Sequence, residues 1–387
     1  MDIKNIDNTY VAHSYGRFPV AFVSGKGAKL YDDEGREYID LGTGIATSIF
    51  GAADDDWVAA VTEQLGKIQH TSNLYYTEPC AKLAQLLCER TGMKKVFFAN
   101  SGAEANECAI KTARRWQHLN YGGERPVIIT LKNSFHGRTI TTLAATGQDV
   151  FHTEFGPFTE GFVYADPNVP GDLTRLAEEN PCCAVMIETV QGEGGVNPLS
   201  TEFVAEVNAV AEKYGLLIIV DEVQTGNGRT GRLYGYMNFD LRPDIVSTAK
   251  GLGGGLPIGA CMLGERVQDV LVPGSHGTTF GGNPVCCAGA INVIERLDEA
   301  LLEGVRQRSE YIITQLSGSK GVISISGMGL MLGIETVRPA KEVINGCLER
   351  GVIVISAKSK VRLLPPLNID MDDLKKAINI LKEELAK

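Results

Sequence analysis

Residues 216–231 read LLIIVDEVQTGNGRTG and residues 243–251 read PDIVSTAKG, and these two stretches are the strongest indication of the fold class. The first begins with a short apolar run that ends in two carboxylates, Asp221 and Glu222. Such a run, rich in β-branched residues, is typical of a strand buried in a parallel sheet. Residues 245–248 predict a second strand, and Lys250 follows it in a glycine-rich turn. Because ligands of open α/β sheets bind at the carboxyl ends of the strands, the acid and the amine are expected at one binding site.

An aspartate and a lysine at such strand ends suit a cofactor that has a basic ring nitrogen and a carbonyl group. Pyridoxal 5'-phosphate (PLP) has both, since a lysine holds its aldehyde and an aspartate pairs with its pyridinium nitrogen. Most lysines are plain surface residues, but Lys250 precedes five glycines in the nine positions 251–259. Those glycines clear space around the amine, and partial burial lowers the pKa of a lysine and makes it nucleophilic.

The rest of the chain alternates strands and helices, which predicts a mostly parallel sheet in an α/β protein. Strands are expected at residues 94–99, 127–131 and 184–187, and helices at 55–67, 79–90 and 202–213. Beyond residue 297 the pattern changes to paired strands and flanking helices. We therefore expect an N-terminal segment (1–50) that packs with a small C-terminal α+β domain (301–387), and a large PLP-binding domain (51–300).

Composition excludes several classes of partner. The chain has 387 residues and a net charge of −10, which disfavours nucleic acid and anionic membranes as ligands. Its apolar runs are too short to cross a bilayer, and its first residues lack the apolar core of a signal peptide. The nine cysteines show no CxxC spacing, which fits free thiols in a reducing cytoplasm.

Residues 216–231 also allow two nucleotide-binding interpretations. An apolar strand ending in Asp221 resembles the metal-binding strand of a P-loop nucleotidase, but the chain contains no GxxxxGK[ST] loop. Residues 226–231, GNGRTG, match the dinucleotide fingerprint GxGxxG, yet RLYGYMNF follows in place of an apolar helix. A nicotinamide-dependent dehydrogenase and a non-catalytic binding protein remain as alternatives.

Ser101, Gly102 and Ala103 lie where the strand at 94–99 becomes a helix. The first amides of a helix lack partners and attract an anion, and a glycine lets a phosphate approach the backbone. The simpler interpretation is that Ser101 is only an N-cap. In the loop after the strand at 127–131, Phe135 either stacks on a flat heterocycle or packs in the core.

Three charged residues are candidates for substrate binding because each lies in a stretch rich in glycine or proline beside an apolar strand: Arg138, Glu193 and Arg362. Solvated surface groups are the ordinary alternative. An enzyme of amino acids needs guanidinium groups to hold carboxylates. The six histidines show no metal-ligand spacing, so no metal site is expected.

Six motifs occur in family order: SGAEAN (101–106), FHGRT (135–139), QGEGG (191–195), DEVQTGNGRTG (221–231), AKGLGGGLPIG (249–259) and HGTTFGGNP (276–284). Through them the chain resembles, over nearly its whole length, the class III (ornithine-type) aminotransferases of PLP fold type I, and among these the acetylornithine aminotransferases. The resemblance implies transfer of the δ-amino group of N-acetylornithine to 2-oxoglutarate in arginine biosynthesis. Succinylornithine, ornithine, 4-aminobutyrate and succinyl-diaminopimelate are alternative substrates.

The resemblance also implies roles for individual residues. Lys250 would hold PLP and shuttle a proton, Asp221 would keep the pyridinium protonated, and Glu193 would cover Arg362 while the ω-amino donor reacts. The cofactor set would be Ser101, Gly102, Ala103, Phe135, Glu188, Asp221, Val223, Gln224 and Lys250, with Thr279 from a second subunit of a homodimer. The substrate set would be Arg138 for the distal carboxylate, Arg362 for the α-carboxylate of glutamate, and Thr278.

The chain departs from the family pattern in two places. Residues 51–56 read GAADDD where the family usually carries Gly-His-x-His-Pro, and Glu188 is followed by Thr189 where the family usually has proline. Neither departure touches the cofactor core, and the first lies near the side of the substrate entrance in the family.

Overall fold

The computed structural model describes residues 2–387, and its centre is a seven-stranded sheet in the order β4-β12-β11-β10-β7-β5-β6. Its strands are β4 (Lys95–Ala99), β5 (Val127–Leu131), β6 (Phe162–Ala165), β7 (Cys182–Ile187), β10 (Leu217–Asp221), β11 (Ile245–Thr248) and β12 (Gly259–Leu263). Every neighbouring pair is parallel except the two that involve β12. The predicted α/β class with a mostly parallel central sheet is confirmed.

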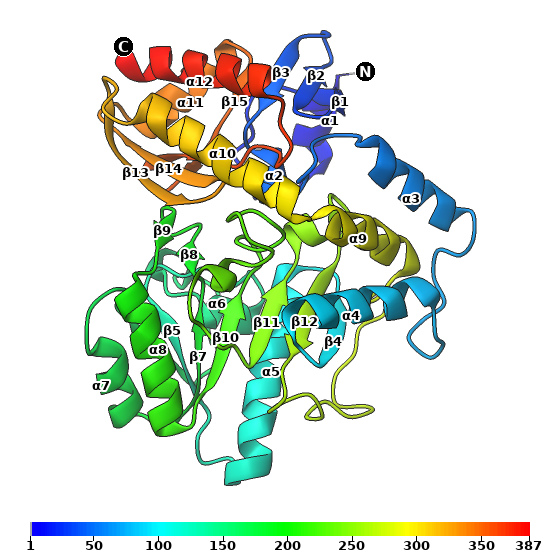
Figure 1. Ribbon diagram of the computed structural model, residues 1–387, viewed down its shortest axis with the longest axis vertical. Helices are drawn as coiled ribbons and strands as arrows, with labels where there is room; N and C mark the ends of the chain where they lie inside the picture. The colour runs from blue at the N-terminus through cyan, green and yellow to red at the C-terminus, as the bar shows by residue number, and fades with distance from the viewer. Residues whose placement is uncertain (1) are drawn as a thin grey trace.

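Both faces of this sheet are covered by helices, which explains why its central strands are apolar throughout. Along β10, Ile218 and Val220 belong to the core cluster that contains α8 (Thr201–Tyr214). The alternate residues Leu217 and Ile219 belong to the cluster that contains α5 (Gly102–Tyr121). In Figure 1, α5 lies behind the sheet, and α8 and α7 (Asp172–Glu179) lie in front of it.

Further helices complete the region around the sheet. They are α3 (Asp55–Leu65), α4 (Glu78–Thr91), α6 (Ile140–Ala145) and α9 (Pro284–Arg296). The expected helices at 55–67, 79–90 and 202–213 agree with α3, α4 and α8 to within two residues at each end.

The last part of the chain forms a separate antiparallel sheet, ordered β13-β14-β17-β16. Its strands are β13 (Val322–Met328), β14 (Met331–Thr336), β16 (Ile355–Ala357) and β17 (Lys360–Leu363), and its helices are α10 (Glu299–Leu316), α11 (Ala340–Glu349) and α12 (Met371–Ala386). This is the expected α+β composition.

The N-terminal strands join these C-terminal elements. β1 (Phe22–Lys26), β2 (Lys29–Asp32) and β3 (Glu37–Asp40) form a sheet with β15 (Val352–Ile353), which runs parallel to β3 with Val352 opposite Ile39. In Figure 1 they lie next to α12 at the top of the molecule, above the large sheet. The domain limits near residues 50 and 300 stay a prediction.

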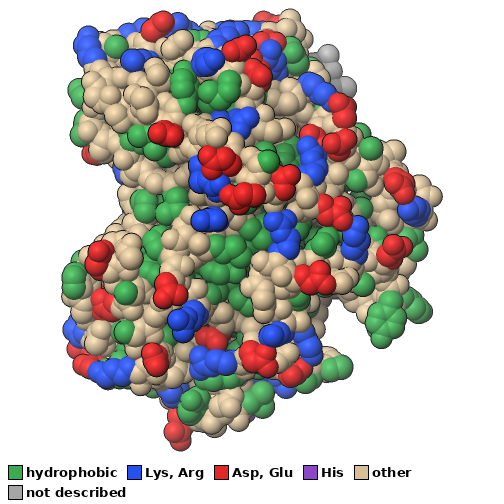
Figure 2. All heavy atoms as spheres, viewed as in Figure 1, with side chains coloured by type: hydrophobic (Ala, Val, Ile, Leu, Met, Phe, Trp, Pro, Cys, Tyr) green, Lys and Arg blue, Asp and Glu red, His purple; other side chains and the backbone are tan. Residues whose placement is uncertain are grey.

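Acidic and basic side chains are interspersed over the face seen in Figure 2, and apolar side chains are visible around the middle of this view. Among residues 2–387, none of the helices combines the length and the apolar character that crossing a membrane requires.

Candidate active site

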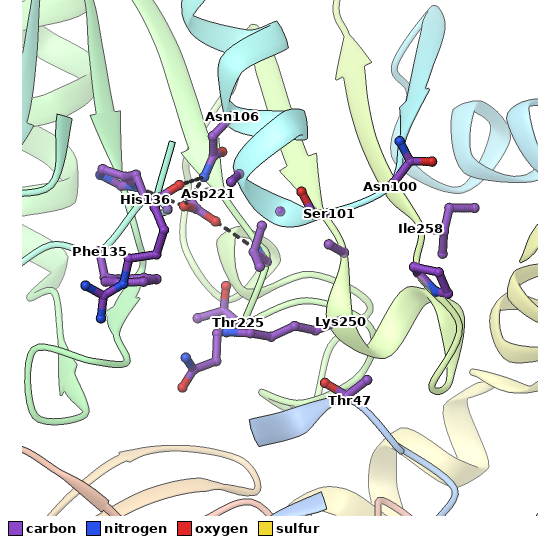
Figure 3. Close-up of a pocket in the computed structure, with 18 of the residues that line it drawn as sticks. Thr47, Asn100, Ser101, Asn106, Phe135, His136, Asp221, Thr225, Lys250 and Ile258 are labelled. Carbon is purple, nitrogen blue, oxygen red and sulfur yellow. Dashed lines mark hydrogen bonds and ion pairs between the residues drawn. The ribbon is translucent and has the colours of Figure 1, made fainter. Parts of the chain in front are cut away.

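A cavity of about 600 Å³ lies where the ends of β10 and β11 face the start of α5. Ten of the predicted site residues line it: Ser101, Gly102, Ala103, Phe135, Arg138, Glu188, Asp221, Val223, Gln224 and Lys250. Asp221 and Lys250 therefore share one cavity, as the strand-end argument requires (Figure 3). Tyr15 and Thr47 from the N-terminal segment also line it, and no sequence signal pointed to them.

Asp221 is buried and is held by three N–H donors. Its Oδ2 accepts from Asn106 Nδ2 at 2.7 Å and from His136 Nδ1 at 2.8 Å, and its Oδ1 accepts from the amide of Val223 at 3.0 Å (Figure 3). Asn106 is oriented in turn, because Ser247 Oγ donates to its Oδ1 at 2.5 Å. These donors compensate the burial of the Asp221 charge and fix the carboxylate at the cavity wall.

Lys250 begins a 3-10 turn, Lys250–Gly253, and has a φ of 45°, in the left-handed region that side chains seldom adopt. The backbone must be held there by its surroundings, and one support is Trp57, whose Nε1 donates to the carbonyl of Gly253 at 3.2 Å. Burial lowers the pKa of Lys250, and the Glu193 carboxylate offsets part of that effect. The lowered pKa makes this amine a better base candidate than an exposed lysine, which stays protonated.

The start of α5 is shaped for an anion. Ser101 is the N-cap, since its Oγ accepts from the amide of Glu104 at 3.2 Å, and it also lines the cavity. A Cβ on Gly102 would lie 2.6 Å from Val223 Cγ1, so only glycine fits between the helix start and the strand end. The first amides of a helix have no acceptor within it, and those of Gly102 and Ala103 are at the cavity wall.

Glu193 and Arg362 form an ion pair beside this cavity, with Arg362 Nη1 2.7 Å from Glu193 Oε1. Gln224 bridges the pair, since its Oε1 accepts from Arg362 Nη1 at 3.0 Å and its Nε2 donates to Glu193 Oε1 at 3.3 Å. The Arg362 side chain is 3% exposed and that of Glu193 is 29% exposed, so the carboxylate lies on the outer side. Burial raises the pKa of Glu193, but the Arg362 charge more than offsets this and the net pKa is lowered.

Arg138 is exposed at the cavity, with its guanidinium 4.1 Å from the Phe151 ring and 5.4 Å from the Phe135 ring. Aromatic faces hold a cation while leaving its N–H groups free for a carboxylate. Glu188 is buried and accepts from the amide of Phe135 at 3.2 Å, and burial together with the Asp221 charge raises its pKa well above the usual range.

Thr278 and Thr279 do not line the cavity of this chain. Thr278 Oγ1 accepts from Asn100 Nδ2 at 2.9 Å, and Thr279 is exposed. Their predicted roles stay predictions.

One atom each from His136, Glu188 and Asp221 lies within 4.8 Å of the others, a spacing that a metal ion could also use. His136 and Asp221 are already hydrogen-bonded to each other. The absence of a metal therefore stays an expectation from the sequence.

The residues present fit PLP. One cavity brings together an acid for the ring nitrogen, an amine for the aldehyde, and a helix start opened by Gly102 for the phosphate. The dinucleotide interpretation lacks its helix, since the first regular element after GNGRTG is the 3-10 turn Gly235–Asn238.

Comparison with known proteins identifies the family. The model for class-III aminotransferases matches residues 10–385. Acetylornithine aminotransferases from Haemophilus ducreyi and Aquifex aeolicus are 47% and 43% identical over 99% and 97% of this chain, and over 98% and 100% of their own. The ornithine aminotransferase structure from Toxoplasma gondii has a TM-score of 0.94 at 31% identity, covering 99% of this chain and 94% of its own. The N-acetylornithine aminotransferase structure from Stenotrophomonas maltophilia has a TM-score of 0.84 at 32% identity, covering 99% and 98%. The chain therefore belongs to the class-III aminotransferases, PLP-dependent enzymes that move an amino group from an amino acid to an oxo acid.

Proposed function

We propose that this aminotransferase moves the δ-amino group of N-acetylornithine to 2-oxoglutarate, giving N-acetylglutamate 5-semialdehyde and glutamate, as a step of arginine biosynthesis. The observation that carries the substrate pair is the Glu193–Arg362 ion pair beside a cavity that Arg138 also lines. Relatives named for acetylornithine, 43–47% identical over almost the whole chain, support the same choice.

The two substrates pose one physical problem. Glutamate brings a carboxylate on the carbon that reacts and a second one at its far end, whereas N-acetylornithine brings only the distant one. Arg138 binds the distant carboxylate of both, and Arg362 binds the α-carboxylate of glutamate. A bare guanidinium beside the acetylornithine chain would be an unpaired buried charge, so Glu193 covers Arg362 during that half-reaction.

PLP, when bound, supplies an aldehyde that combines with amines and a ring that accepts electrons from the reacting carbon. Asp221 would keep a proton on the ring nitrogen, and Asn106 and His136 hold Asp221 in place. Lys250 Nζ takes the proton from the carbon that bears the amino group, which its lowered pKa permits.

Replacing Arg362 by alanine tests this assignment. The variant loses a charged hydrogen bond to the α-carboxylate, worth roughly 1.5–3 kcal/mol, or roughly 10- to 150-fold in kcat/KM of the glutamate half-reaction. The acetylornithine half-reaction, followed by stopped-flow absorbance, should change far less. The control is Arg138→Ala, which should weaken both half-reactions. Equal losses in both for Arg362→Ala, or a wild-type preference for free ornithine over N-acetylornithine, would overturn the proposal.

We infer further that the enzyme is a cytoplasmic homodimer with shared active sites. Thr279 is exposed and lies outside the cavity of its own chain, which suits a contribution to a neighbouring one. Phe280 beside it is 59% exposed and Tyr76 is 106% exposed, and exposed apolar groups of this size favour burial in an interface. All nine cysteines are free thiols, as a reducing compartment favours.

A further inference from the structure

Arg229, the arginine of GNGRTG, is 1% exposed and has no part in the chemistry described above. Burying a guanidinium costs several kcal/mol unless hydrogen bonds replace its water. Its Nη1 donates to two backbone carbonyls, that of Leu330 at 3.1 Å and that of Pro365 at 2.5 Å. Leu330 lies in the turn between β13 and β14, and Pro365 follows β17. A charged side chain of the large sheet's loop thus joins two strand ends of the small sheet.

The backbone of Arg229 makes the same connection. Its carbonyl accepts from the amide of Leu330 at 2.9 Å. A Cβ on Gly329, whose φ is +56°, would lie 2.5 Å from the Arg229 carbonyl oxygen, so the approach requires glycine. The contact is therefore built from both sides.

The guanidinium is directed at carbonyls instead of a carboxylate. No ion pair within 4.0 Å includes Arg229 among residues 2–387. The acid whose charge acts on it is Asp40, and Asp40 Oδ1 accepts from the amides of Gly42 at 2.7 Å and Thr43 at 2.9 Å. Burial lowers the pKa of Arg229 to about 9, and the Asp40 charge opposes this. Removing such a residue leaves two buried carbonyls without donors.

The same two segments meet again at the active site. Arg362 lies on β17, before Pro365, and Gln224 lies in the loop 221–231, before Arg229. Gln224 bonds Arg362, and Arg229 bonds Pro365. Within its own sheet β17 is held by β14 and β16. Two attachments to the loop therefore fix the position and the orientation of this strand relative to the loop, whereas one attachment would fix only a single point.

We propose that Arg229 is a positioning residue that fixes β17 against the loop 221–231, so that Arg362 is aligned with Glu193 and Gln224 for the α-carboxylate of glutamate. The proposal rests on the function proposed above, in which Arg362 binds that carboxylate. A positioning role predicts a larger loss in the glutamate half-reaction. A residue that only stabilises the fold would weaken both half-reactions alike.

The experiment compares Arg229→Met and Arg229→Lys in the holoenzyme. Methionine fills the space but donates no hydrogen bond, and the KM for glutamate and 2-oxoglutarate should rise about tenfold while the acetylornithine half-reaction stays within about twofold. Lysine donates to carbonyls and should recover part of the loss. The matched control is Arg306→Met, since Arg306 Nη1 donates to the carbonyl of Gly231 at the end of the same loop, at 2.7 Å, from α10. Arg306→Met should show no preference between half-reactions.

A double-mutant cycle decides whether Arg229 acts through Arg362. In an Arg362→Ala background, Arg229→Met should cause no further loss in the glutamate half-reaction. Amide hydrogen exchange at residues 360–364 and at Leu367 should be faster in Arg229→Met with Arg362 intact. Equal losses in both half-reactions, a full additional loss in the double variant, or unchanged exchange would each overturn the proposal. Failure of the Arg362 assignment is recognised separately, because the Arg362→Ala single variant then shows no selectivity.

Discussion

Lys250 is the residue on which the proposed chemistry depends, because it alone among the cavity residues offers a primary amine. Lys250→Ala should abolish turnover and the visible absorption band that borohydride removes, with the fold intact by circular dichroism and the unfolding free energy changed by only about 1 kcal/mol. Single-turnover assays with N-acetylornithine measure the first effect. Substantial transamination by this variant would contradict the role of Lys250.

The sequence predicted Asp221 and Lys250 because each follows a short apolar strand, and strand ends meet at one edge of a sheet. It did not predict that Asn106 and His136 hold Asp221. These hydrogen bonds join three elements: α5, β10 and the loop that follows β5. A local sequence pattern does not predict contacts between elements that are distant in the chain. The only available signal for Asn106 and His136 was their membership of SGAEAN and FHGRT.

At the scale of elements, the loop 221–236 is closed by one buried carboxylate. Glu222 accepts from Thr225 Oγ1 at 2.7 Å, from the amide of Gly235 at 2.7 Å and from the amide of Tyr236 at 2.6 Å. Burial raises the pKa of Glu222 to about 7 despite these donors. Since this folded-state pKa is above the unfolded one, the stabilisation is complete below about pH 4.5 and is lost as the pH rises through 7.

The unfolding free energy should therefore fall between pH 5 and pH 8, by an amount on the order of 3 kcal/mol from this group. Urea unfolding at several pH values measures it. Glu222→Gln should remove most of that slope and lower stability at pH 5, because an amide has only one acceptor oxygen. Glu384→Gln is the control: Glu384 is also buried, but hydrogen bonds from Lys387 and Arg350 outweigh burial and lower its pKa, so the slope should persist. An unchanged slope in Glu222→Gln would exclude this origin.

The sequence predicted five of the seven strands of the large sheet, but it did not predict β6 or β12. The five residues of β12, GACML, are all small or apolar, so they show no alternation of polar and apolar side chains that would predict a strand. Its antiparallel direction has a physical cause: only residues 249–258 connect β11 to β12, and a parallel pair needs a crossover of a dozen or more residues. The loop that carries Lys250 is thus a direct return between neighbouring strands.

The departure GAADDD also has a structural explanation. Asp54 is the N-cap of α3, accepting from the amide of Trp57 at 3.0 Å, and it pairs with Arg296 of α9 at 2.5 Å and 3.0 Å. The aspartate at this position begins a helix and ties it to its neighbour.

At the scale of the whole molecule, the proposed sharing of active sites predicts complementation between two inactive variants. Lys250→Ala lacks the amine, and in the proposed dimer Thr279→Glu would place a negative charge against the phosphate of the neighbouring site. In a mixed dimer one site carries both changes and the other carries neither. Equal amounts exchanged at random should recover about one quarter of the wild-type activity, since half the dimers are mixed and each has one intact site.

Specific activity after mixing and re-equilibration measures this, and sedimentation velocity checks that the species is a dimer. Mixing two copies of the same variant is the control and should recover nothing. A mixture that stays inactive while forming mixed dimers would show that each chain builds its site alone.

The pairing of β3 with β15 has a consequence for how the chain reaches this state. Ile39 is synthesised long before Val352, its neighbour in the sheet. During translation one edge of β3 has unpaired backbone N–H and C=O groups until β15 is synthesised. Such an edge can pair with the wrong strand. Closing a loop of this length carries an entropy penalty that only the finished polypeptide can offset. Nearly the entire chain must therefore leave the ribosome before β3 can pair with β15.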